Sequence, residues 1–210
     1  MKYTHIIWDF NGTIFDDVEI GIESVNVLLA ARNMPLISSK EYYRSVHSFP
    51  VIDYYKKIGF DFSKESFDDI AVEWVREYMS RLPKAGVHQE ALEMLSYIRK
   101  NGAKQILLSA TEEKMLLGQV KDLGIEPYFD EICGMDNIYA HGKKSLAERW
   151  RQNHPDARAL LVGDTDHDFE VAQVMGADCI LFAGGHQSRN VFAGLGCPVV
   201  DSLLEVKNFL

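Results

Sequence analysis

A single short apolar strand precedes a long block of helices, and this feature limits most strictly what the chain can fold into. Ile6, Ile7 and Trp8 have the β-branched and aromatic bulk of a strand that is buried on both faces. Residues 16–83, which follow, show helical patterns throughout. A strand cannot pair with helices, so its partner strands must come after residue 83. The sequence therefore predicts a helical block inserted into a unit that contains a sheet.

The rest of the pattern defines the fold class. Within the helical block, apolar residues recur at helical spacing over Val18–Leu29 and Phe67–Leu82. From residue 84 onward, helices and short buried strands alternate, which predicts an α/β fold with a Rossmann-like, mostly parallel sheet. The core would comprise residues 1–15 and 84–210, with an all-helical cap domain at 16–83. The later strands are expected at 105–108, 132–133, 159–162, 179–182 and 199–200, with further helices near Val191 and from Leu203.

Composition excludes several classes of protein. The 210 residues are 47% hydrophobic and 25% charged, with a net charge of −9 and no basic patch, so no nucleic-acid partner is expected. No secretory signal and no apolar run of about 18–20 residues is present, so no membrane partner is expected either. Cysteines number three, an odd count, and form no Cys-x-x-Cys pair, which favours buried free thiols in a reducing cytoplasm. They are Cys133, Cys179 and Cys197. A monomer and a homodimer both remain open.

Polar side chains follow several of the expected strands directly. Asp9 follows the first strand, Ser109 follows 106–108, and Gly163-Asp164 ends the strand at 160–162. The carboxyl ends of parallel strands meet at one edge of a sheet, where ligands collect. Two carboxylates suit Mg²⁺, and a serine hydroxyl with a lysine ammonium suits phosphate oxygens. Lys143 and Lys144, at the start of a helix, can supply that ammonium group.

These residues carry a family resemblance that covers the whole chain. Asp9-Phe10-Asn11-Gly12-Thr13, Ser109, Lys143 and Gly163-Asp164-x-x-x-Asp168 resemble the four motifs of the haloacid dehalogenase (HAD) superfamily. The chain looks most like the phosphoglycolate-phosphatase-type members, which insert a helical cap just after the first motif. The resemblance therefore implies a HAD-like core and a Mg²⁺-dependent phosphatase that acts on a small phosphorylated metabolite.

The resemblance also implies residue roles. Asp9 would attack phosphorus and form an aspartyl-phosphate. Asp9, the backbone carbonyl of Asn11 and Asp164 would bind Mg²⁺. Asp168 would orient the lysine or a metal-bound water. The phosphoryl group would be held by Asn11, Gly12, Ser109, Ala110 and Lys143, where Lys143 is preferred to Lys144 because it follows Gly142 at the helix start.

Asn11 departs from the phosphatase pattern. Phosphatases of this superfamily usually have an aspartate there, which protonates the leaving oxygen and then activates water. An amide hydrogen-bonds but does not exchange a proton near neutral pH. The departure indicates slow turnover, a good leaving group or an acid supplied from elsewhere. The candidates for such an acid are Asp16, Asp17, His47 and Asp166.

Other functions stay open beside the phosphatase. A phosphonate-cleaving enzyme would, by resemblance, use a cap lysine as a Schiff base, and Lys56 and Lys57 lie in the cap. The chain could instead be a phosphometabolite-binding protein with low turnover, in which Asn11 is the change that reduced activity. Dehalogenation is disfavoured because Asp164 keeps a metal ligand that the metal-free dehalogenases lack. The histidines show no zinc spacing, although His186 could line the crevice. The aromatic residues Tyr42, Tyr43, Tyr54 and Tyr55 are expected to pack the cap.

Overall fold

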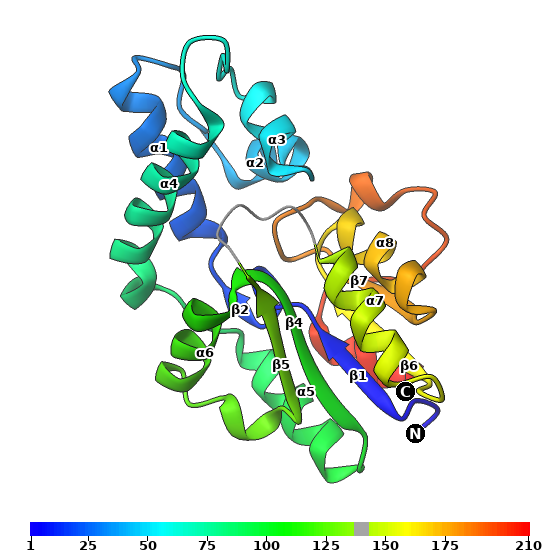
Figure 1. Cartoon of the computed structure of the whole chain (residues 1–210). Helices are drawn as coiled ribbons and strands as arrows, with labels where there is room; N and C mark the ends of the chain where they lie inside the picture. Colours follow the sequence, from blue (N-terminus) through cyan, green and yellow to red (C-terminus); the bar gives the residue numbers. More distant parts are fainter. Residues whose placement is uncertain (137–142) are drawn as a thin grey trace.

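The computed structural model describes residues 1–136 and 143–210, and a parallel sheet forms the centre of the molecule. Its six strands lie in the order β5-β4-β1-β6-β7-β8, and every neighbouring pair is parallel. The first strand therefore lies in the middle of the sheet, between strands that come much later in the chain (Figure 1). The strands are β1 (His5–Trp8), β4 (Lys104–Glu112), β5 (Glu131–Met135), β6 (Ala159–Gly163), β7 (Asp178–Phe182) and β8 (Val199–Val200).

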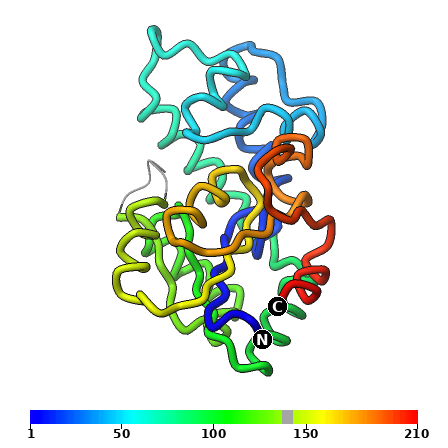
Figure 2. Tube along the Cα trace, turned by 90° about the vertical axis from the view of Figure 1, so that its right-hand side faces the viewer, coloured from blue at the N-terminus to red at the C-terminus, as the bar shows by residue number. Residues whose placement is uncertain are grey.

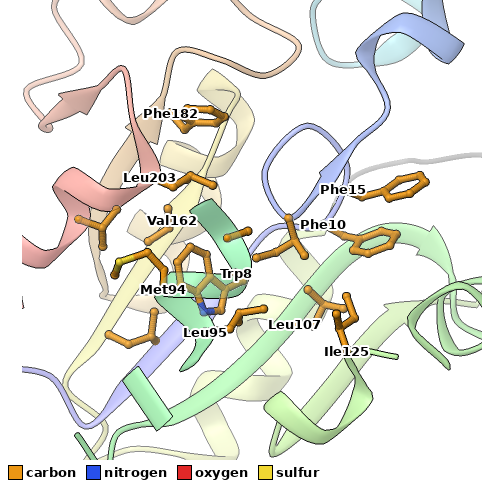
Figure 3. Packing of buried hydrophobic residues seen from close by; sticks show 14 of the residues in the cluster. Trp8, Phe10, Phe15, Met94, Leu95, Leu107, Ile125, Val162, Phe182 and Leu203 are labelled. Atoms are coloured by element: carbon orange, nitrogen blue, oxygen red, sulfur yellow. The ribbon is translucent and has the colours of Figure 1, made fainter. Parts of the chain in front are cut away.

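Helices cover both faces of the sheet because successive side chains of a strand point to opposite sides. Trp8 packs with residues of α5 (Gln89–Lys100), α6 (Glu113–Asp122) and the 3₁₀ helix η4 (Leu203–Phe209). Its neighbour Ile7 packs on the other face with α7 (Lys144–Asn153) and α8 (Asp166–Met175). Figure 3 shows Trp8 among Met94, Leu95 and Val162. The buried indole of Trp8 donates a hydrogen bond to Gln105 at 3.0 Å, which satisfies its polar atom inside this core.

Four helices form a separate lobe at one end of the molecule. They are α1 (Val18–Ala31), α2 (Lys40–Val46), α3 (Val51–Lys57) and α4 (Phe67–Arg81), and they share their own apolar core. Both termini lie at the opposite end (Figures 1 and 2). The chain leaves the sheet through β2 (Phe15–Asp16) and returns through η1 (Leu82–Lys84) and β3 (Gly86–Val87), and β2 and β3 pair antiparallel. We continue to propose residues 16–83 as the inserted cap domain.

Local details differ from the expectations. The strand expected at 105–108 continues to Glu112, with an irregular register after Leu108, so Ser109 lies within β4 rather than after it. The segments near Val191 and from Leu203 form the 3₁₀ helices η3 (Arg189–Phe192) and η4 instead of α-helices, and η2 (Glu126–Tyr128) is a further 3₁₀ turn. With three and four residues, η2 and η3 are too short to establish α-helical hydrogen bonding.

Two further expectations can be compared with the structure. Cys179 is buried, whereas Cys133 and Cys197 are only half-buried, so the expectation that all the thiols are buried was wrong for two of them. Gly142 and His141 lie outside the described residues. Within the described ranges, no helix has the length and apolar character that crossing a membrane would require.

Candidate active site

Three carboxylates and one ammonium group meet at the carboxyl end of the sheet. Asp9 follows β1, Asp164 follows β6, and Asp168 lies in the first turn of α8. One carboxylate oxygen from each of the three lies within 4.8 Å of the other two. The buried ammonium group of Lys143 donates to Asp9 and, at 2.6 Å, to Asp168. The strand-end arrangement predicted from the sequence thus brings these four residues together.

Asp168 has a structural task as well as its contact with Lys143. One of its oxygens accepts hydrogen bonds from the Thr165 amide and hydroxyl, forming a capping box at the start of α8, while the other binds Lys143. Burial alone would raise the pKa of Asp168, but the charge of Lys143 and these hydrogen bonds lower it below its usual value. Asp168 therefore stays ionised and holds the lysine ammonium toward Asp9.

The Asp164 carboxylate is enclosed by backbone. It accepts hydrogen bonds from the Thr13 hydroxyl at 3.1 Å and the His186 amide at 2.6 Å. A Cβ atom on Gly12 or Gly185 would collide with this carboxylate, and Gly12 has a positive φ of 76°. Only glycine lets the backbone approach so closely in that conformation. The glycine in the first motif is therefore explained by the fit around Asp164.

The charge balance of the cluster suits a divalent cation. Burial, together with the negative charges of Asp168 and Asp164, raises the pKa of Asp9 well above its usual value, although Lys143 opposes the shift. Burial likewise raises the pKa of Asp164 to about 6. Each of these carboxyl groups resists ionisation in the presence of the other. A divalent cation would stabilise both ionised forms. The donor set consists of oxygen atoms, which hard cations prefer, so these residues fit such an ion.

Asn11 lies in a hydrogen-bond network that the sequence did not reveal. Its amide donates to Asp17 and to the Tyr78 hydroxyl, both at 2.9 Å, and its carbonyl accepts from Thr111 at 2.9 Å. Tyr78 in turn donates to Asp17 at 2.7 Å. Tyr78 comes from α4 and Thr111 from β4, so three distant parts of the chain orient one amide. The sequence had named Asp17 as a candidate acid to replace the missing aspartate, but it gave no role to Tyr78 or Thr111.

Asp17 forms the second charged pair of the site. His186 contacts it at 3.1 Å through Nε2, and Nδ1 of the same ring contacts the Tyr43 hydroxyl at 2.8 Å. Burial would lower the pKa of His186, but Asp17 raises it to about 9. Burial would raise the pKa of Asp17, yet His186 and the hydrogen bonds from Tyr78 and Asn11 lower it. The pair is therefore ionised near neutral pH.

Ser109 has a less direct position. Its buried hydroxyl donates to the Thr111 hydroxyl at 3.0 Å and accepts from the Thr111 amide at 3.1 Å. Ala110 and Thr111, not Ser109, are among the described residues that line the cavity above the cluster. Lys144, the other lysine considered, is half-exposed and pairs with Glu170 at 3.0 Å. Lys143 is therefore the lysine that the structure places in the site.

A cavity of about 200 Å³ opens between the carboxylate cluster and the helical lobe. Of the candidate acids, Asp17 and His47 line it; Asp16 is exposed, and Asp166 is half-buried and bonded to Gln187. Burial lowers the pKa of His47 well below its usual value, so its ring is neutral. His186, which the sequence placed near the crevice without a role, lines the cavity.

The tyrosines expected to pack the cap also take part in the site. Tyr43, Tyr54 and Tyr55 belong to the apolar core of the lobe and also line the cavity. Tyr42 is exposed, so the expectation that it packs the cap was wrong. The cap face of the cavity is therefore strongly aromatic.

Comparisons of the sequence and of the structure with known proteins point to the same family. Residues 6–182 match the family model described as haloacid dehalogenase-like hydrolase. A phosphoglycolate phosphatase of Mesorhizobium japonicum is 25% identical over 194 residues, covering 89% of this chain and 85% of the relative. Two solved structures share the fold at low identity. One is a haloacid dehalogenase-like hydrolase from Streptococcus pneumoniae (TM-score 0.83, 18% identical, 99% and 98% coverage) and the other is CbbY from Rhodobacter sphaeroides in complex with phosphate (TM-score 0.70, 17% identical, 97% and 96% coverage).

Proposed function

The chain belongs to the haloacid dehalogenase-like hydrolases and is a phosphatase of that family, and we propose that it is a cytoplasmic, Mg²⁺-dependent enzyme that hydrolyses a small phosphorylated metabolite through an aspartyl-phosphate on Asp9. The observation that supports this most directly is Lys143, which binds Asp9 and Asp168 at once beside Asp164. This arrangement places the nucleophile beside a positive charge, which would also stabilise a bound phosphoryl group. A monomer or a homodimer would serve equally well.

In the proposed reaction, Asp9 attacks phosphorus and the bond to the leaving oxygen breaks. Lys143 offsets the charge of the phosphoryl oxygens, and Asp168 keeps the ammonium group in place. The Ser109 hydroxyl and the Ala110 amide are the neutral donors expected around the same group, whereas the Gly12 amide donates to Asp17 at 2.8 Å and to the Phe15 carbonyl at 2.9 Å. Asp9, Asp164 and the backbone carbonyl of Asn11 would hold Mg²⁺, which supplies further positive charge for transfer. Water then attacks phosphorus, the bond to Asp9 breaks, and phosphate is released.

The two other functions are less well supported. Lys56 pairs with Asp53 at 2.9 Å and Lys57 with Ser48 at 2.9 Å, and both are exposed. Neither has the apolar pocket that lowers the pKa of a Schiff-base lysine. A protein that binds phosphometabolites without turnover differs from the proposal only in rate, so it is tested by counting turnovers.

Replacing Asp9 by asparagine tests the proposal. Asp9→Asn should abolish turnover because an amide is not a nucleophile, whereas the fold should persist because the change removes a buried charge that is costly without a cation. Native protein should release many equivalents of phosphate and be trapped by beryllofluoride with Mg²⁺; the variant should do neither. Asp16→Asn, at an exposed carboxylate, is the matched control. Release of one equivalent or less by native protein on every substrate would favour the binding function instead.

A further inference from the structure

We propose that the leaving group of the substrate is an uncharged aromatic group, so that the enzyme acts on aryl phosphate monoesters rather than on phosphates whose leaving groups are anionic. This inference rests on the proposed phosphatase function and adds the substrate class. Three features of the site support it. Aromatic rings form one wall of the cavity, and the cations that line it are already paired with carboxylates. Position 11, where phosphatases of this superfamily usually have an acid, is an amide.

Aromatic rings from the helical lobe form the cavity wall that faces the cluster. Trp74 stacks on Tyr78 with ring centroids 4.7 Å apart and planes inclined by 20°, and Tyr78 hydrogen-bonds Asn11. Tyr55 and Phe67 meet edge to face at 6.0 Å. All four rings line the cavity. The wall thus extends from Asn11 outward, where a ring attached to a bound phosphoryl group would lie, and rings pack well against rings.

The cationic side chains that line the cavity are already paired with carboxylates. Among the described residues that line it, Lys143 is the only lysine or arginine, and the ring of His47 is neutral because burial lowers its pKa. Lys143 is bound to Asp9 and Asp168, and His186 to Asp17. A carboxylate or second phosphate on the leaving group would find no unpaired cation in this lining and would meet several carboxylates. An uncharged leaving group avoids that repulsion.

Asn11 supports the same substrate class through leaving-group chemistry. In the first step Asp9 bonds to phosphorus and the P–O bond to the leaving group breaks, with the electron pair going to that oxygen. A phenolate, whose conjugate acid has a pKa of about 10, leaves without prior protonation far more readily than an alkoxide, whose conjugate acid is close to water at about 15.7. The phenolate then takes its proton from solvent. Such a departure requires no acid, whereas that of an alkoxide does, and the Asn11 amide, which donates to Asp17 and Tyr78, supplies none.

A set of matched substrates separates these contributions. Phenyl phosphate has an aromatic ring and a good leaving group. Benzyl phosphate has a ring but a poor leaving group, and acetyl phosphate has a good leaving group but no ring. 2-Phosphoglycolate and 4-carboxyphenyl phosphate carry the negative charge. With Mg²⁺, kcat for phenyl phosphate should exceed that for benzyl phosphate by about 10²–10⁴-fold, the usual contribution of general acid catalysis. Its KM should lie below that of acetyl phosphate, and 2-phosphoglycolate should be the poorest substrate.

Variants with matched controls test the wall and the charge balance separately. Trp74→Ala should raise KM for phenyl phosphate about 3- to 10-fold and leave that for acetyl phosphate unchanged; Val72→Ala, exposed on the same helix, is the control. Met115 lines the cavity, and Met115→Arg should raise kcat/KM for 4-carboxyphenyl phosphate relative to phenyl phosphate. Leu117→Arg, exposed on the same helix, should not.

The outcomes separate the two proposals. No hydrolysis of any of these substrates, together with no beryllofluoride trapping on Asp9, would overturn the phosphatase proposal itself. Trapping on Asp9 with faster turnover of 2-phosphoglycolate than of phenyl phosphate would overturn only the aryl inference. Equal effects of Trp74→Ala on phenyl and acetyl phosphate would also contradict it, because the ring would then not be the group that contacts Trp74.

Discussion

At the scale of single residues, Asn11 is held by contacts that an aspartate would not make. Its amide donates to the ionised Asp17 at 2.9 Å, and Asp17 is already fixed by Tyr78, His186 and the Gly12 amide. A carboxylate at position 11 would face the Asp17 carboxylate at that distance. The surroundings of position 11 therefore favour an amide over a carboxylate. Asn11 is thus not merely an aspartate that has been lost.

We accordingly expect Asn11→Asp to have two opposed effects. The variant should lose about 1–3 kcal/mol of stability, because a donor is lost and the new, half-buried carboxylate faces the buried carboxylate of Asp17. It should gain turnover mainly on substrates with poor leaving groups, such as benzyl phosphate, by supplying an acid. The ratio of kcat values, variant over native, should therefore rise with the pKa of the leaving group, and Tm should fall.

The double variant Asn11→Asp/Asp17→Asn is the control for this prediction, because it exchanges the two groups and removes the repulsion. Its Tm should recover part of the loss. A ratio of kcat values that stays flat across leaving groups would mean that another residue already protonates the leaving oxygen or that native turnover never requires it.

At the scale of elements, helix α2 is attached to the loop after β7 by several polar contacts. The Arg44 guanidinium donates to the carbonyl groups of Gly184 and Gly185, and the Gln187 amide donates to the His47 carbonyl at 3.1 Å. The same loop supplies His186 to the site. The attachment of the lobe thus also sets the position of a residue in the active site.

We predict that Arg44→Met loosens this attachment. Charge-assisted hydrogen bonds contribute about 1.5–3 kcal/mol each when buried, and Arg44 is half-buried, so a smaller loss of about 1–2 kcal/mol is expected. Amides 184–188 should exchange hydrogen faster, and KM should rise about 3- to 10-fold because the cavity closes less firmly. Lys40→Met, at an exposed residue of α2 that pairs with Glu19, should change neither quantity. Unchanged exchange at 184–188 in Arg44→Met would contradict the attachment.

Strand-level patterns could be predicted because they are local, whereas contacts between elements could not. The apolar runs identified the central strands, and the residues that follow them placed Asp9 and Asp164 at one edge. The extension of β4 to Glu112 was missed because polar Ser109 and Thr111 look like a turn in sequence, whereas the strand continues through an irregularity between Leu108 and Glu112, and Glu112 pairs again with Met135. Tyr78 was missed as a partner of Asn11 because their contact depends on how α4 packs over the sheet, which no local pattern encodes.

At the scale of the whole molecule, the carboxylate cluster links folding stability to both pH and metal. Without a cation, the raised pKa of Asp164, about 6, means that the carboxyl group is easier to ionise in the unfolded chain, where its pKa is about 4. Ionised Asp164 therefore opposes folding above pH 6, and this penalty disappears as the pH falls from 6 toward 4. A bound cation reverses this effect. Because the cation binds only the ionised carboxylate, ionised Asp164 then favours folding.

We predict that Mg²⁺ raises Tm at pH 7.5 and loses this effect as the pH falls through about 6. At a concentration 100 times Kd, a ligand of the folded state adds about 2.7 kcal/mol, which corresponds to a rise in Tm of about 5–10 °C for a chain of this size. Asp164→Ala should abolish the rise at every pH, whereas Asp156→Ala, at an exposed carboxylate outside the cluster, should retain it. Thermal unfolding with Mg²⁺ and with chelator, at pH 5.0 and 7.5, measures these differences. An equal rise at both pH values, or one that survives in Asp164→Ala, would mean that the ion stabilises the protein from another site, and the oxygen cluster around Asp9 would lose its proposed role.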